Sequence, residues 1–178
     1  GRGYIVRSPN GWSSTPSVFT ANFVGVPNNG NITRPITRST YTGSNYTGPT
    51  STQVTANDDN WNLLGNPYPS AIDAIAFLSA NNTHIDGFVD LWTHGNAPAS
   101  IADPFYQDYQ LNYNPNDYLR YNNTGGTQFG FDGKIGAGQG FFVLMRDAGG
   151  TTENAIFNNS MRSNTHRNDQ FYRTSDPN

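Results

Sequence analysis

Apolar residues occur along this chain in short runs, and Gly, Pro or Asn separates each run from the next. Within most runs apolar and polar positions alternate, which is typical of a strand that buries one face. Short strands at regular spacing, joined by turns, predict an all-β fold, and we expect a jelly-roll-like β-sandwich. The strand candidates lie at 3–7, 17–26, 31–37, 61–64, 87–94, 117–121, 141–145 and 154–159.

Two of these candidates carry more specific predictions. The run FFVLM at 141–145 is the most hydrophobic in the chain and predicts a central strand. Asn29-Gly30 is typical of a hairpin turn, so 17–26 and 31–37 are expected to pair with each other. Pro35 cannot donate a backbone hydrogen bond, which places the second of these strands at a sheet edge.

The length of 178 residues suits one domain, which we expect over 1–162. Residues 163–178 form a polar tail with a further strand candidate at 170–174. The chain begins with Gly1 rather than Met, so we expect it to be an excised or processed piece of a longer protein.

The segment WNLLGNPYPSAIDAIAFLSA, 61–80, combines a strand, a proline turn and a helix. Its first residues fit a buried strand, and the two prolines end that strand. Ser70 stands where a helix N-cap is expected, with Asp73 at capping-box spacing. Apolar residues then recur at helical spacing, which predicts one short helix of about three turns near 70–80. The apolar stripe comprises Ala71, Ala74, Ile75 and Leu78.

Polarity comes from amides and hydroxyls more than from charge, because only 13% of residues are charged and Lys134 is the single lysine. A net charge of −3 without a basic stripe argues against nucleic-acid binding. No apolar stretch approaches the roughly 18 residues of a membrane-spanning helix, so no membrane insertion is expected. The absence of cysteine excludes disulfides and thiol chemistry.

Several passages of the chain resemble a module of large secreted Bacteroidota proteins, of the kind found just upstream of type IX secretion sorting domains. WNLLGNPYPSAID at 61–73 is the most specific of these passages. The others are GRGYIVRSP (1–9), GFVDLWTH (87–94), GQGFFVLM (138–145), FNNSMR (157–162) and QFYRT (170–174).

This resemblance implies an extracellular, cell-surface location and a modular role in adhesins or other giant surface proteins of flavobacteria. Modules of this kind continue past QFYR into further strands, whereas this chain stops at Asn178. We therefore expect either completion of the fold by a partner segment or a trimmed fragment.

The chain offers no convincing catalytic constellation, and we expect no enzyme. It has no G-x-S-x-G motif, and its three histidines show no H-x-x-x-H spacing. Glycoside hydrolysis needs two carboxylates that flank a cleft, and nothing in the spacing of the aspartates selects such a pair. A polysaccharide-active enzyme fragment is the weakest of the alternatives.

Calcium is the one metal that the residue pattern favours. Ca²⁺ takes carboxylate and carbonyl oxygens from loops. Asn57, Asp58 and Asp59 offer such oxygens just before the strand that starts at Trp61. The segment lacks the glycine and terminal glutamate of an EF-hand loop, and a solvated acidic turn is the simpler interpretation.

Aromatic and polar residues that suit a carbohydrate gather in and after the 87–94 run. Sugars place C–H faces on aromatic rings and hydroxyls on amides and carboxylates, although aromatic residues also fill cores and pair across strands. In 87–94 the alternation puts Asp90, Trp92 and His94 on the more polar face. The candidate ligand-binding residues are Asp90, Trp92, His94, Tyr106, Asp108, Tyr109 and Tyr113.

Two functions remain open for the chain. The first is a non-catalytic extracellular adhesion or glycan-binding module, with a polysaccharide or cell-surface glycan as its partner. The second is a structural module that spaces domains or self-associates by strand completion, with neighbouring domains or copies of itself as partners.

Overall fold

The computed structural model describes residues 1–4, 15, 20, 22, 24–38, 60–93, 117–127 and 131–168, together with the backbone of two short strands, β2 (Tyr46–Thr47) and β3 (Gln53–Val54). In this part of the chain no helix has the length and apolar character that a membrane crossing requires. The strand candidate at 170–174 lies outside the described residues.

The largest element is a five-stranded antiparallel sheet in the order β4-β10-β6-β7-β8. The run at 141–145 supplies β10, which lies between β4 and β6, so the predicted central strand is confirmed. Residues 1–3 run along the far edge of β4, where the Gly65 amide donates to the Gly1 carbonyl at 2.9 Å. The strand bounds are β4 (Trp61–Gly65), β10 (Gly140–Leu144), β6 (Phe88–Trp92), β7 (Tyr118–Asn122) and β8 (Gly125–Gly126).

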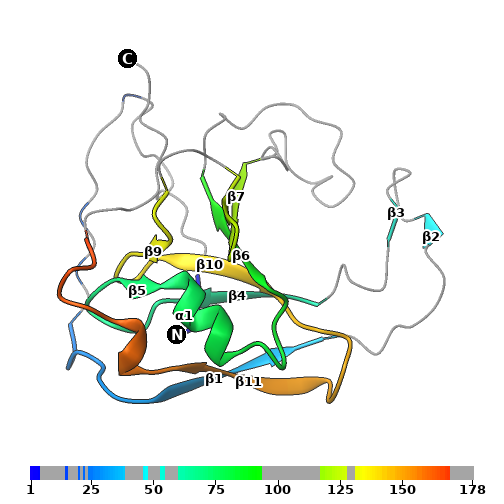
Figure 1. Cartoon of the computed structure of the whole chain (residues 1–178), viewed down its shortest axis with the longest axis horizontal. Helices are drawn as coiled ribbons and strands as arrows, with labels where there is room; N and C mark the ends of the chain where they lie inside the picture. The colour runs from blue at the N-terminus through cyan, green and yellow to red at the C-terminus, as the bar shows by residue number, and fades with distance from the viewer. Residues whose placement is uncertain are drawn as a thin grey trace.

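A second layer faces this sheet. It contains the antiparallel pair β1 (Ile32–Thr37) and β11 (Thr152–Phe157), which runs along the lower side of the molecule in Figure 1. It also contains the short pair β5 (Ile72–Asp73) and β9 (Lys134–Ile135) and the helix α1 (Ala74–Ala80). A 3₁₀ turn, η3 (Asn159–Met161), follows β11.

The core lies between these two layers. Phe77 of α1 contacts Phe141 of the sheet edge-on, with ring centroids 5.2 Å apart, and Phe157 of β11 at 5.0 Å. The helix therefore joins the two layers. The architecture is all-β and sandwich-like with one short α-helix among the described residues, as the sequence predicts. The other buried core residues include Leu64, Ile72, Val89, Leu91, Leu119, Ile135, Val143 and Met145.

The helix begins later than predicted and is shorter. Asp73, not Ser70, is the N-cap, and its side chain accepts a hydrogen bond from the Ala76 amide at 2.8 Å. The reason is that Ile72 and Asp73 pair with β9, which keeps the backbone extended up to the cap. Only seven residues, or two turns, remain helical. Of the predicted stripe, Ala71, Ala74 and Leu78 are buried, and Ile75 is partly exposed.

The predicted hairpin across Asn29-Gly30 is wrong. The strand that follows it, β1, pairs with β11, which is more than a hundred residues away in the chain. The described residues of the predicted partner strand, among them Val24 and Val26, form no strand and are exposed. Long-range contacts hold the turn instead, since Gly30 donates to the Asn159 side chain and accepts from the Tyr68 hydroxyl.

Candidate functional site

The two faces of the five-stranded sheet differ in character. Because side chains alternate along a strand, one set points into the core and the other points away from it. The outward set is mostly aromatic or aliphatic, yet nearly all of it is partly or fully exposed. An apolar, partly exposed sheet face that carries a few polar groups is typical of an interaction site. The outward residues are Trp61, Leu63, Phe88, Asp90, Trp92, Tyr118, Arg120, Asn122, Phe142 and Leu144.

Strand register arranges these side chains in rows across the sheet. Phe142 of β10 lies opposite Asp90 of β6, and Asp90 lies opposite Arg120 of β7, so these three form a middle row. Trp61 of β4 pairs with Leu144, two residues to one side of that row. Tyr118 of β7 lies two residues to the other side. The two aromatic side chains therefore flank the middle row.

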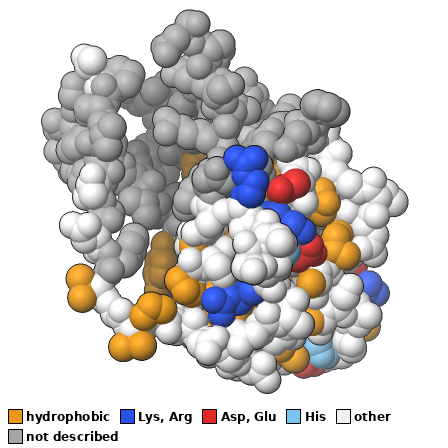
Figure 2. Space-filling model, turned by 60° about the vertical axis from the view of Figure 1, so that its left-hand side comes forward, with side chains coloured by type: hydrophobic (Ala, Val, Ile, Leu, Met, Phe, Trp, Pro, Cys, Tyr) orange, Lys and Arg blue, Asp and Glu red, His pale blue; other side chains and the backbone are white. Residues whose placement is uncertain are grey.

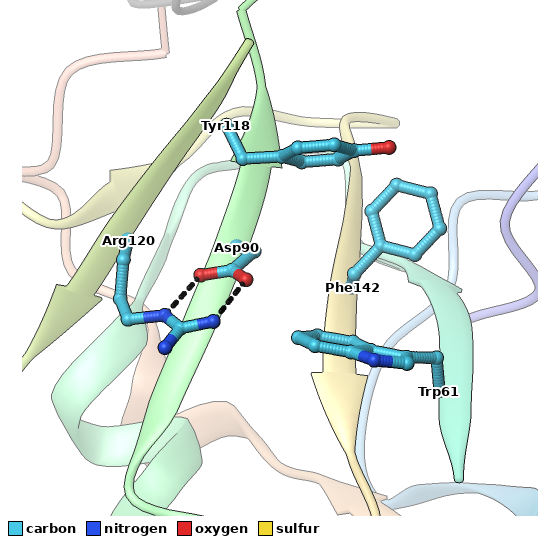
Figure 3. Close-up of a pocket in the computed structure, with 5 residues that line it drawn as sticks. All are labelled: Trp61, Asp90, Tyr118, Arg120 and Phe142. Atoms are coloured by element: carbon cyan, nitrogen blue, oxygen red, sulfur yellow. Dashed lines mark hydrogen bonds and ion pairs between the residues drawn. The ribbon is translucent and has the colours of Figure 1, made fainter. Parts of the chain in front are cut away.

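A hollow of about 400 Å³ opens on this face. Its described lining comprises Trp61, Asp90, Tyr118, Arg120 and Phe142, which come from four strands. Figure 3 shows the rings of Trp61 and Tyr118 on opposite sides of the hollow, with Asp90 and Phe142 between them. The volume lies in the lower part of the range of small-molecule sites, roughly 300–1,000 Å³.

The polar group of the hollow is a bidentate ion pair. Arg120 donates from Nε to Asp90 Oδ1 at 2.9 Å and from Nη2 to Oδ2 at 2.8 Å. The Asp90 side chain is buried, at 8% exposure, whereas the Arg120 side chain is 45% exposed. The hydrogen bonds that Arg120 donates to the Asp90 carboxylate raise the pKa of Arg120, so the guanidinium stays charged. Its Cζ lies 3.8 Å from the centre of the Phe88 ring, which fixes the plane of the guanidinium.

The two flanking rings are exposed but held in place. Trp61 is 38% exposed and packs on Phe88 with centroids 5.9 Å apart. Tyr118 is 41% exposed and meets Phe142 edge-on at 5.6 Å. Large aromatic side chains with fixed orientation can bind a ligand without a large loss of conformational freedom.

The hollow suits a small polar ligand that has apolar faces. Its rings supply flat apolar walls, Asp90 supplies acceptor oxygens, and Arg120 supplies a donor. Among the described residues, no group of three or more His, Asp or Glu side chains is placed to hold a metal ion.

The residues expected at a ligand site are only partly within the described chain. Asp90 and Trp92 lie on the outward face of β6, as their alternation predicts, and Asp90 lines the hollow. Trp92 lies opposite Tyr118 in the neighbouring row. The remaining ligand candidates, His94, Tyr106, Asp108, Tyr109 and Tyr113, and the calcium candidates, Asn57, Asp58 and Asp59, lie outside the described residues.

Sequence reasoning missed four residues of the hollow, namely Trp61, Tyr118, Arg120 and Phe142. Trp61 was expected in a buried strand together with Leu63 and Leu64, but it points outward while Leu64 is buried. A signal was present in the run YLRYN, where buried Leu119 separates the outward Tyr118 and Arg120. Alternation could identify the outward residues of each strand, but not which strands are neighbours.

Apart from Trp61, the block at 61–73 builds the fold rather than the hollow. The buried side chain of Asn66 donates to the carbonyls of Ser70, Ile135 and Gly136 and accepts from the Tyr68 amide. These bonds hold the proline turn against the loop that precedes β10. The distinctive sequence of this block is thus explained by structural needs.

Comparison with known proteins finds one family. The family model described as "Domain of unknown function (DUF8693)" matches residues 1–178, the whole chain. No curated protein and no solved structure matches the chain.

Proposed function

We propose that this chain, which belongs to the DUF8693 family of domains of unknown function, is a non-catalytic carbohydrate-binding module of a secreted, cell-surface protein. The hollow on the outward face of the five-stranded sheet carries the proposal. It combines two exposed, oriented aromatic rings with a buried carboxylate and an exposed guanidinium. Carbohydrates need this combination, because each sugar ring has C–H faces and a rim of hydroxyl groups.

The surface of the molecule supports an extracellular setting. Figure 2 shows only a few charged side chains among the described residues of one face, in line with the 13% charged residues of the sequence. The resemblance of 61–73 to modules of large Bacteroidota surface proteins supports the same setting. In that role the module would attach its parent protein to a polysaccharide or to a glycan of another cell.

The first test is binding to a panel of polysaccharides, by glycan array and by pull-down with insoluble polymers. Trp61→Ala and Tyr118→Ala should each weaken binding by about tenfold or more, which corresponds to a loss of ~1.4 kcal/mol. Tyr4→Ala is the matched control, since Tyr4 is an aromatic residue with 71% exposure that does not line the hollow. Circular dichroism checks that each variant is folded.

Two results would contradict the proposal. One is the absence of binding to any polysaccharide of the panel. The other is binding that survives in both Trp61→Ala and Tyr118→Ala, since the hollow would then play no part in it.

A further inference from the structure

We infer that the hollow selects a neutral pyranose whose ring substituents are all equatorial, as in β-1,4-linked glucose or xylose units. This inference rests on the proposed function and names the class of sugar. It follows from the position of the aromatic rings, from the position of the ion pair and from the volume of the hollow.

The hollow has an aromatic wall on each of two sides. Trp61 and Tyr118 come from β4 and β7, which are separated by two strands, and they stand on opposite sides of the row that Phe142 and Asp90 share. In Figure 3 both rings turn a face toward the space between them. A sugar ring in that space therefore places both of its faces against aromatic surface.

Sugar stereochemistry decides which rings tolerate two such walls. A pyranose with only equatorial substituents presents axial C–H bonds on both faces, and these pack on aromatic rings. An axial hydroxyl instead points out of one face, into an aromatic wall. There it loses its hydrogen bonds to water without gaining a partner, which costs about 1–3 kcal/mol. Mannose has an axial hydroxyl at C2 and galactose has one at C4, so both are disfavoured.

The polar groups lie where equatorial hydroxyls would be. Equatorial hydroxyls radiate in the plane of the sugar ring, and between the two walls that plane meets Asp90 and Arg120 (Figure 3). The Asp90 oxygens can accept from one hydroxyl. Among the described residues Nη1 of Arg120 has no hydrogen-bond partner, so it can donate to the neighbouring hydroxyl. Because the pair has no net charge, it favours a neutral sugar over an acidic one.

The volume limits the ligand to a short stretch of a glycan. About 400 Å³ is small for a ligand site and suits one or two sugar rings. The remainder of a polysaccharide chain would extend beyond the hollow along the surface.

The test compares three soluble hexaoses by isothermal titration calorimetry. Cellohexaose and xylohexaose have only equatorial hydroxyls, whereas β-1,4-mannohexaose carries one free axial hydroxyl, at C2, in each ring. Because all three chains have the same equatorial β-1,4 linkage, ring stereochemistry is the main variable. We expect whichever of cellohexaose and xylohexaose binds more tightly to exceed mannohexaose in affinity by about tenfold or more.

Variants of Tyr118 test whether the aromatic walls cause the preference for equatorial sugars. Tyr118→Phe keeps the ring and should retain the preference, whereas Tyr118→Ala should weaken cellohexaose binding by about tenfold, with Tyr4→Ala as the unaffected control. Equal or tighter binding of an axial sugar, sensitive to Trp61→Ala, would overturn the inference and leave the proposed function standing. Cellohexaose binding that is unchanged in Tyr118→Ala would also overturn it. If no hexaose and no polysaccharide binds, both the inference and the proposed function fail.

Discussion

Two buried asparagine side chains connect segments of this fold that are distant in the chain. Asn66 and Asn81 are both buried, and each makes several hydrogen bonds to backbone groups of distant segments. A side-chain amide offers both donors and an acceptor, so it can take the place of a missing strand partner. The high asparagine content of the sequence is therefore in part structural, and not only a sign of turns.

Asn81 allows this role to be measured. Its amide donates to the carbonyls of Phe77 and Ile156 and accepts from the Ile156 amide, which ties the end of α1 to β11. Asn81→Ala should lower the free energy of unfolding by about 2–4 kcal/mol, because it leaves buried backbone groups without partners. Urea denaturation gives the value. Asn82→Ala is the control, because Asn82 is exposed, and it should change the stability by less than about 0.5 kcal/mol.

Asp73 makes stability depend on pH. Partial burial alone would raise its pKa, but hydrogen bonds from Lys134 and from the Ala76 amide outweigh burial and lower the pKa. A carboxyl group with a lowered folded-state pKa stabilises the fold above its unfolded pKa, near 3.9, and loses this effect as the pH falls through the folded value. Asp73→Asn keeps a capping side chain. It should destabilise the protein by about 0.5–1 kcal/mol at pH 7 and by less at pH 3.

Urea denaturation of the wild type and of Asp73→Asn at both pH values gives this comparison. A difference between the two proteins that is the same at pH 7 and pH 3 would show that the carboxylate charge contributes nothing.

At the level of elements, the sequence pattern predicted the strands and the helix whose buried face can be recognised from their own residues. The strands at 88–92, 118–122 and 140–144 and the helix near 74–80 each bury an apolar face that the sequence displays. The hairpin prediction failed because β1 pairs with β11, which lies far away in the chain, and not with the preceding segment. The predicted start of the helix was too early because the two residues before α1 pair with β9. In both cases a long-range partner overrode a local signal.

The hollow could not be predicted from the sequence, for a related reason. It needs β4, β10, β6 and β7 to be neighbours in that order, and the order does not follow the sequence. Asp90 was found because its own strand shows the alternation clearly. Phe142 lies in an apolar run, where an outward residue resembles an inward one.

The contact between α1 and the two sheets depends on Phe77. Its ring lies against both Phe141 and Phe157 and is fully buried. Phe77→Ala should lower the free energy of unfolding by about 3–5 kcal/mol, the usual range for a phenylalanine removed from a core. Ile75→Ala is the control on the same helix, because Ile75 is partly exposed, and it should have a smaller effect. Similar losses for the two variants would mean that α1 does not join the layers through Phe77.

For the molecule as a whole, one edge of the second layer is blocked against strand addition. Pro35 of β1 has no amide hydrogen to donate. Thr37 is occupied on the same side by the Asn62 side chain, which accepts from its amide at 2.9 Å and donates to its carbonyl at 2.8 Å. This arrangement hinders pairing with another copy of the chain, so it argues against self-association through β1.

Light scattering after size exclusion tests this conclusion. The wild type should be a monomer at high concentration, and the double variant Pro35→Val with Asn62→Ala should form larger species because it exposes a continuous strand edge. A wild type that self-associates would instead favour the assembly role. A double variant that stays monomeric would show that something else protects the edge.

The alternation along β10 has an evolutionary consequence. Phe141 and Val143 face the interior, whereas Phe142 and Leu144 face the outer side of the sheet, so substitutions in the second pair should disturb the core less than substitutions in the first. Relatives could diversify the second pair, and the equivalent positions of β4, β6 and β7, to recognise new partners while the interior stays unchanged. A randomised library confined to those outward positions should therefore yield many well-folded binders from a single scaffold.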